Sequence, residues 1–101
     1  ELAFTGRMVE GVEAAEIGLA TKVSDDPRAV ALAMAADIAA KSPDAIRGTK
    51  ALLDMAGRVS LAESFAEEAR IQSELIGSPN QVESVTAYFE QRAPRFTDPG
   101  S

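Results

Sequence analysis

Apolar residues recur along most of the chain at the three- and four-residue spacing that is typical of amphipathic helices. Near the C-terminus, Val82, Val85 and Phe89 fall on one face of a helical wheel. Upstream, Leu61 and Phe65 share a face in the same way. The pattern predicts a mostly α protein in which each helix has one apolar side to bury.

Four start signals divide the chain into helices. Each places a cap acceptor beside a compatible first helical residue or uses the capping-box spacing. In chain order they are Asp26-Pro27, Ser42-Pro43, Ser60 with Glu63, and Ser78-Pro79. The first of these helices is expected to reach about Lys41. Gly57 and Gly77 are predicted helix ends, because glycine adopts the left-handed conformation without a Cβ penalty. Pro94 prevents the last helix from continuing far.

The first 24 residues follow a different pattern. Residues 12–17 predict a helix of under two turns that ends at Gly18. Residues 19–23 alternate between apolar and polar side chains and predict one short strand. A single strand is unstable without a ladder partner. We therefore expect its partner to lie upstream or in another chain. Because the sequence begins at Glu1 within an apparent helix, we also expect a fragment of a longer protein.

Composition excludes several classes of chemistry and several kinds of partner. The 101 residues contain neither cysteine nor histidine, which excludes disulfides, thiolate chemistry and imidazole bases or ligands. Sixteen acids against ten bases give a net charge of -6, so we expect no nucleic-acid partner. No apolar run approaches the roughly 20 residues of a membrane span. No secretory signal is recognisable, and we expect a cytoplasmic location without a membrane partner.

Acidic residues that lie close in sequence are the first candidates for acid–base chemistry. They form two clusters, Glu13 with Glu16 and Glu63 with Glu67 and Glu68. On amphipathic helices such acids usually lie on the solvated face, whereas a catalytic carboxylate needs burial to shift its pKa. We therefore expect no catalytic residue among them. The spacing also predicts no metal site, since an EF-hand loop is missing.

Two basic residues stand out near the end of this acidic chain. Arg92 and Arg95 flank Pro94 just after the last predicted helix. Cations at a helix C-terminus stabilise the helix dipole, which is the structural interpretation. Guanidinium groups also bind phosphate oxygens in a forked geometry, which is the functional one. Both arginines are therefore candidate ligand-binding residues.

Taken in order, several segments resemble the C-terminal part of the enoyl-CoA hydratase/isomerase (crotonase) superfamily. The segments are ELAFTGR at 1–7, VEAAEIGL at 12–19, KV at 22–23, IA at 38–39, SPDAI at 42–46, Lys50, Glu68, SPN at 78–80 and ESVTAYFEQRAPRF at 83–96. The resemblance covers nearly the whole chain. Each piece is short, and the specificity comes from their order and spacing.

The resemblance implies a fold and a function for a longer protein. Family members have an N-terminal ββα spiral core followed by a helical region that promotes trimer formation. They bind acyl-CoA thioesters and stabilise an enolate oxyanion with two backbone N–H groups. The oxyanion donors, and the two glutamates of hydratase members, lie in segments upstream of those matched here. The resemblance therefore implies no catalytic residue in this chain, no cofactor beyond the coenzyme A thioester substrate, and a homo-oligomer, either a trimer or a dimer of trimers.

The resemblance also implies a domain organisation. Residues 1–24 would end the crotonase-like core, 25–96 would form a four-helix oligomerisation domain, and 97–101 would be a flexible tail. Hydratase members contact coenzyme A through an aromatic residue and a lysine at the positions of Gln72 and Gln91, so here Arg92 and Arg95 are the candidates for a coenzyme A phosphate. The alternative function is a free-standing helical oligomerisation or protein-binding module without enzymatic activity.

Overall fold

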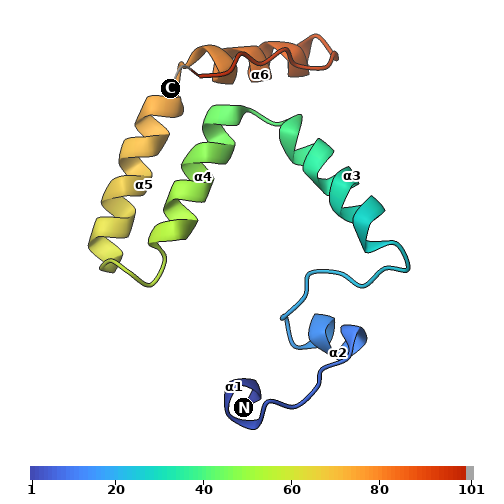
Figure 1. The fold of residues 1–101 in the computed structure, drawn as a ribbon. Coiled ribbons are helices and arrows are strands. Elements are labelled where there is room, and N and C mark those ends of the chain that lie inside the picture. The colour runs from blue at the N-terminus through green and yellow to red at the C-terminus, as the bar shows by residue number, and fades with distance from the viewer. Residues whose placement is uncertain (100–101) are drawn as a thin grey trace. The chain divides into compact units, whose positions relative to one another are not determined.

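The computed structural model describes residues 1–99, which form six helices and no strand (Figure 1). The helices are α1 (Leu2–Thr5), α2 (Gly11–Glu16), α3 (Pro27–Ala39), α4 (Pro43–Met55), α5 (Leu61–Leu75) and α6 (Pro79–Phe89). Contacts divide the chain into two compact units, Glu1–Met34 and the residues from Ala35 onward. The boundary falls within α3. The predicted division at residues 24 and 96 stays a prediction, and residues 100 and 101 of the predicted tail lie outside the described residues.

All four predicted helix starts are confirmed, and three of the four cap side chains accept a backbone hydrogen bond. The Asp26 carboxylate accepts the N–H of Ala29 at 2.9 Å. Ser60 and Glu63 form the complete capping box at the start of α5. Ser78 accepts the N–H of Gln81 at the start of α6. Ser42 precedes α4 without such a bond, so proline at the first helical position and Asp44 in the first turn favour that start.

The strand predicted at residues 19–23 was wrong. The N–H groups of Leu19 and Ala20 instead donate to the carbonyl of Ala14, at 2.8 and 2.9 Å. Gly18 has a φ of 77° and turns the chain back over the end of α2. Alternation alone does not form a strand, because the extended backbone needs a neighbouring strand for its hydrogen bonds. The short apolar segment at the start of the chain forms helix α1.

A single arginine connects the two short helices of the first unit. Arg7 donates from Nε to Glu1 at 2.6 Å and from Nη2 to Glu13 at 2.6 Å. The two carboxylates, with Glu13 as the larger cause, raise the pKa of the Arg7 guanidinium. Arg7 thereby links the N-terminus of α1 to α2, two helices too short to be stable by themselves.

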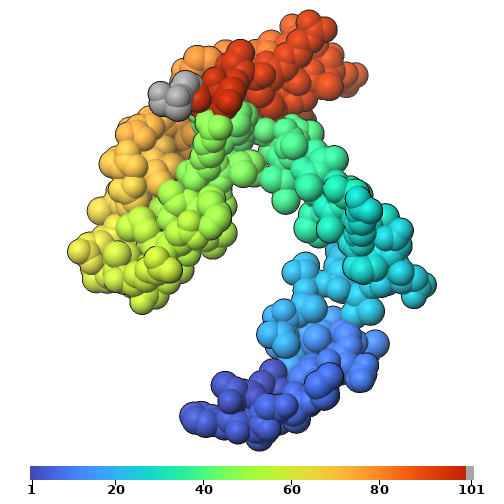
Figure 2. Space-filling model, viewed as in Figure 1, coloured from blue at the N-terminus to red at the C-terminus, as the bar shows by residue number. Residues whose placement is uncertain are grey.

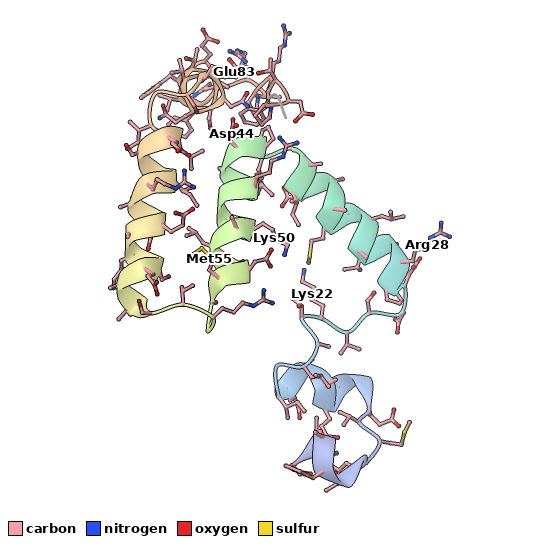
Figure 3. The ribbon with its side chains drawn as sticks, turned by 60° about the vertical axis from the view of Figure 1, so that its left-hand side comes forward. Lys22, Arg28, Asp44, Lys50, Met55 and Glu83 are labelled. Carbon is pink, nitrogen blue, oxygen red and sulfur yellow. The ribbon has the colours of Figure 1, made fainter. Side chains whose placement is uncertain are left out.

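The second unit is organised around the antiparallel pair α4 and α5. Ile71 on α5 lies opposite Gly48 on α4 and is 8% exposed. Ile71 and Ala87 are the hydrophobic residues that are buried among the described positions. Figure 3 shows Asp44 at the end of α4 that lies nearest α6, with Lys50 and Met55 further along the helix. The alanine-rich helix α3 buries no residue.

Within residues 1–99, no helix combines the length and the apolar character that a membrane span requires.

Candidate functional site

The candidate site lies where α6 ends and the chain reverses. The N–H of Gln91 donates to the carbonyl of Tyr88 at 3.2 Å, and the N–H of Arg92 donates to that of Ala87 at 3.1 Å. These two bonds define a Schellman motif. Its left-handed position, usually a glycine, is occupied by Gln91 with a φ of 53°. The turn directs Arg92 back along α6.

Arg92 forms a fork with Glu83, the residue of α6 that is labelled in Figure 3. Its Nη1 and Nη2 donate to the two oxygens of Glu83 at 2.5 and 3.0 Å. Its Nε donates to Glu90 at 2.6 Å. The Glu83 side chain is 22% exposed, so this ion pair is screened less than a surface pair. The N–H groups at Nε, Nη1 and Nη2 of Arg92 therefore each donate to a carboxylate of this chain.

Glu83 is the centre of this cluster. Besides Arg92, it accepts the backbone N–H of Arg95 at 2.6 Å. The fork from Arg92, followed by the bond from Arg95, lowers the pKa of Glu83 from its usual 4.5 to about 2. The carboxylates of Glu83 and then Glu90 in turn raise the pKa of Arg92. Glu83 is therefore ionised and occupied at any physiological pH.

Arg95 is placed differently from Arg92. Its backbone is fixed by Glu83, but its guanidinium forms no ion pair with any acid among residues 1–99. The structure thus brings both predicted arginines to Glu83, one by its side chain and the other by its main chain. Of the two arginines, Arg95 is the one whose side-chain donors have no acceptor among residues 1–99.

Three of the other candidate acids form hydrogen bonds within the chain. Glu13 binds Arg7, Glu63 completes the capping box of α5, and Glu67 binds Arg70 at 2.6 Å. The bonds from Ser60 lower the pKa of Glu63, and the bond from Arg70 lowers that of Glu67. Among the residues that the structure describes, no group of three acids is arranged to hold a metal ion.

A shallow cavity of about 380 Å³ opens between α4 and α5. Its rim carries Arg47 and Arg70, which are the charges most suited to an anion. Arg47 already binds Asp98 at 2.7 Å, and Arg70 binds Glu67 and Glu74. The positive charges of both arginines on the rim are therefore neutralised by acidic side chains of this chain. Gln72, at the position where hydratase members place an aromatic residue, lines a second hollow of about 180 Å³ on this helix pair.

Sequence reasoning missed two residues that organise the site, Glu83 and Asn80. Glu83 lies nine residues before its partner Arg92, and Asn80 lies 17 residues before its partner Thr97. Neither separation is a helical period, so no periodicity could reveal the pairs. Asn80 follows the Ser78-Pro79 helix start, but nothing in the sequence marks its amide as buried.

The amino-acid sequence matches the model of a known protein family. The family model for enoyl-CoA hydratase/isomerase matches residues 1–99, and the chain belongs to that family. It is 34% identical over 102 residues to mouse enoyl-CoA hydratase domain-containing protein 2, mitochondrial, a match that covers 95% of this chain and 34% of that protein. It is 35% identical over 99 residues to the peroxisomal Delta(3,5)-Delta(2,4)-dienoyl-CoA isomerase of Arabidopsis thaliana, covering 95% of this chain and 36% of that one.

A solved structure shows the same fold. The crystal structure of an enoyl-CoA hydratase from Polaromonas sp. JS666 superposes with a TM-score of 0.83 at 26% identity. The superposition covers 91% of this chain and 37% of that one. The chain therefore spans about a third of the length of the relatives it matches.

Proposed function

We propose that this chain is the C-terminal helical part of an acyl-CoA hydratase or isomerase, and that it packs against the enzyme core and against sister subunits. In the parent enzyme the substrate would be an enoyl-CoA thioester of fatty acid metabolism, and the reaction would be hydration or isomerisation. The family match over residues 1–99 supports this proposal, together with the share of the relatives that the chain spans. The cytoplasmic location and the lack of nucleic-acid, membrane and cofactor partners stay predictions.

Uncovered apolar helix faces are the observation that carries the packing role. Leu53 on α4 is 67% exposed, Phe65 on α5 is 60% exposed, and Phe89 on α6 is 77% exposed. Tyr88 packs edge-to-face on Phe89 and is itself exposed. Burial stabilises by roughly 25 cal/mol per Å² of apolar surface, so these faces favour association. A family trimer, or a dimer of trimers, would cover them.

Sedimentation velocity over a range of protein concentrations tests the packing role. We expect the chain to self-associate and to bind a dye that reports exposed apolar surface. Phe89→Ser should weaken the association, whereas Ser84→Ala on the same helix should leave it unchanged. A stable monomer that binds no dye would contradict the proposal.

Catalysis is expected to need groups outside this chain. The acids described above are held by Arg7, Ser60, Arg70 and Arg92, and the chain has no histidine or cysteine. The purified, helical chain incubated with crotonyl-CoA should therefore leave the ultraviolet absorbance of the enoyl thioester unchanged. Turnover by the chain alone would overturn this proposal. A reading frame that starts near Glu1 would favour the free-standing module instead.

Arg95 is the better candidate for a coenzyme A phosphate, because Glu83 and Glu90 occupy Arg92. Thermal unfolding with coenzyme A and with dephospho-coenzyme A tests this, since stabilisation follows ligand occupancy. We expect Arg95→Ala to abolish any shift that depends on the 3′-phosphate. Arg28→Ala on α3 removes the same charge and should keep the shift. Equal loss in both variants would indicate a nonspecific charge effect.

A further inference from the structure

The chain does not end at α6 but returns along it in an extended conformation. Residues 95–99, which we name the strap, have neither helical nor strand structure. Figure 2 shows this segment lying against α6 and reaching the first turns of α4. Its path in Figure 1 is antiparallel to α6. An extended segment without a neighbouring strand must satisfy its peptide groups in another way.

Asn80 satisfies both peptide groups of one strap residue. Its Oδ1 accepts the N–H of Thr97 at 2.9 Å, and its Nδ2 donates to the carbonyl of Thr97 at 2.8 Å. Asn80 is 4% exposed, so these bonds are shielded from water. A primary amide carries the same donor and acceptor as a peptide group. Asn80 therefore binds Thr97 as a neighbouring strand would.

Glu83 repeats this contact one helical turn later. Its carboxylate accepts the N–H of Arg95 at 2.6 Å. The contacts at residues 95 and 97 come from Glu83 and Asn80, which lie three residues apart on one face of α6. They involve main-chain atoms of the strap, and the Thr97 hydroxyl adds a longer contact to Asn80 Oδ1 at 3.4 Å.

The far end of the strap is attached to α4. The remaining hydrogen of the Asn80 amide donates to Asp44 at 2.6 Å. Arg47, one turn along α4 from Asp44, donates to Asp98 at 2.7 Å and to the carbonyl of Pro99 at 3.2 Å. Asp98 and Arg47 are both exposed, so this pair orients the strap more than it stabilises it. Asn80 thus joins three segments, α6, α4 and the strap.

We propose that α6 and the first turns of α4 form a binding site for an extended peptide backbone with one acidic side chain. The face of α6 that carries Asn80 and Glu83 lines this site, and the chain fills it with its own residues 95–99. The occupied site acts as a latch. It fixes α6 to α4, two helices that share little direct contact. It also sets the position from which Arg95 and Arg92 project.

Two substitutions at one position separate backbone recognition from side-chain packing. Thr97→Pro removes the N–H that Asn80 accepts, whereas Thr97→Ala keeps the whole peptide group. Amide hydrogen exchange of Arg95 in the full chain is the readout. We expect roughly tenfold faster exchange in Thr97→Pro and a change of less than about twofold in Thr97→Ala. Equal rates in the two variants, whether fast or slow, would overturn the proposal.

A double-mutant cycle tests whether Asn80 is the partner. Asn80→Ala should accelerate exchange at Arg95 about as much as Thr97→Pro, and the double variant should add little, because both changes remove one interaction. Ser84→Ala is the control on α6. Multiplicative effects in the double variant would contradict the assignment. Thr97→Pro leaves α6 intact, so the proposal remains testable even where Asn80→Ala unfolds the helix.

Discussion

Gly48 of α4 lies so close to Ile71 of α5 that a Cβ atom on the glycine would come within 2.7 Å of Ile71 Cγ2. The isoleucine atom is attached to Cβ, next to the backbone, and cannot swing away as the end of a long side chain can. Absence of a side chain at position 48 therefore sets the separation of the two helices. This close approach also buries Ile71, the one large apolar residue that is buried among residues 1–99.

Gly48→Ala should destabilise the helix pair. Overpacking costs about 1–3 kcal/mol, and the gain in helix propensity returns about 1 kcal/mol, so we expect a net loss of up to about 2 kcal/mol in urea unfolding. Gly11→Ala is the control, because its nearest neighbour is Val23 at 3.8 Å. Ile71→Ala in the same chain should relieve the clash and reduce the cost of Gly48→Ala. A Gly48→Ala variant more stable than the natural chain would refute the steric argument.

The three serine caps should differ in strength. Ser60→Ala and Ser78→Ala each remove a side-chain bond to a backbone N–H, and each should cost ~1 kcal/mol of unfolding free energy. Ser42→Ala should cost clearly less, because Ser42 makes no such bond. Unfolding in urea followed by circular dichroism measures all three. Equal losses at the three positions would show that side-chain capping is not the cause.

Glu83 should make the stability depend on pH in the acidic range. Its pKa is about 2 in the folded chain and about 4.5 when unpaired, so its contribution is complete above pH 4.5 and is lost as the pH falls toward 2. Glu83→Gln should flatten this part of the pH profile of unfolding. Glu68→Gln, which removes a charge from α5 without touching Arg92, should not. Glu63 and Glu67 also have lowered pKa values and leave a residual slope in every variant.

Gln91→Gly should stabilise the end of α6. Glutamine there adopts a φ of 53°, a conformation that costs a residue with a Cβ roughly 1–2 kcal/mol relative to glycine. We expect the Tm to rise by roughly 5 °C for each kcal/mol gained. Gln72→Gly within α5 is the matched control and should lower the Tm, because glycine is unfavourable in a helix interior. A fall in Tm for Gln91→Gly would mean that the glutamine side chain stabilises the turn.

Local sequence determined where the helices begin and end. The starts at Pro27, Pro43, Leu61 and Pro79 follow from caps and prolines whose partners lie within three residues. The ends at Gly57 and Gly77, with φ of 75° and 80°, follow from the freedom of glycine. Such signals act over one helical turn and do not need the rest of the molecule. The family resemblance was likewise carried by short motifs in a fixed order.

Tertiary structure decided everything that joins distant residues. Asn80 with Thr97 and Asp44, and Arg47 with Asp98, are pairs separated by 17, 36 and 51 residues, and no local pattern marks them. The strand expected at 19–23 failed for the same reason, because alternation describes one strand and says nothing about a partner. Backbone and side-chain hydrogen bonds between distant segments form only when the chain brings both groups together. The sequence therefore determined the helices and their family, and the fold decided which of their polar groups meet.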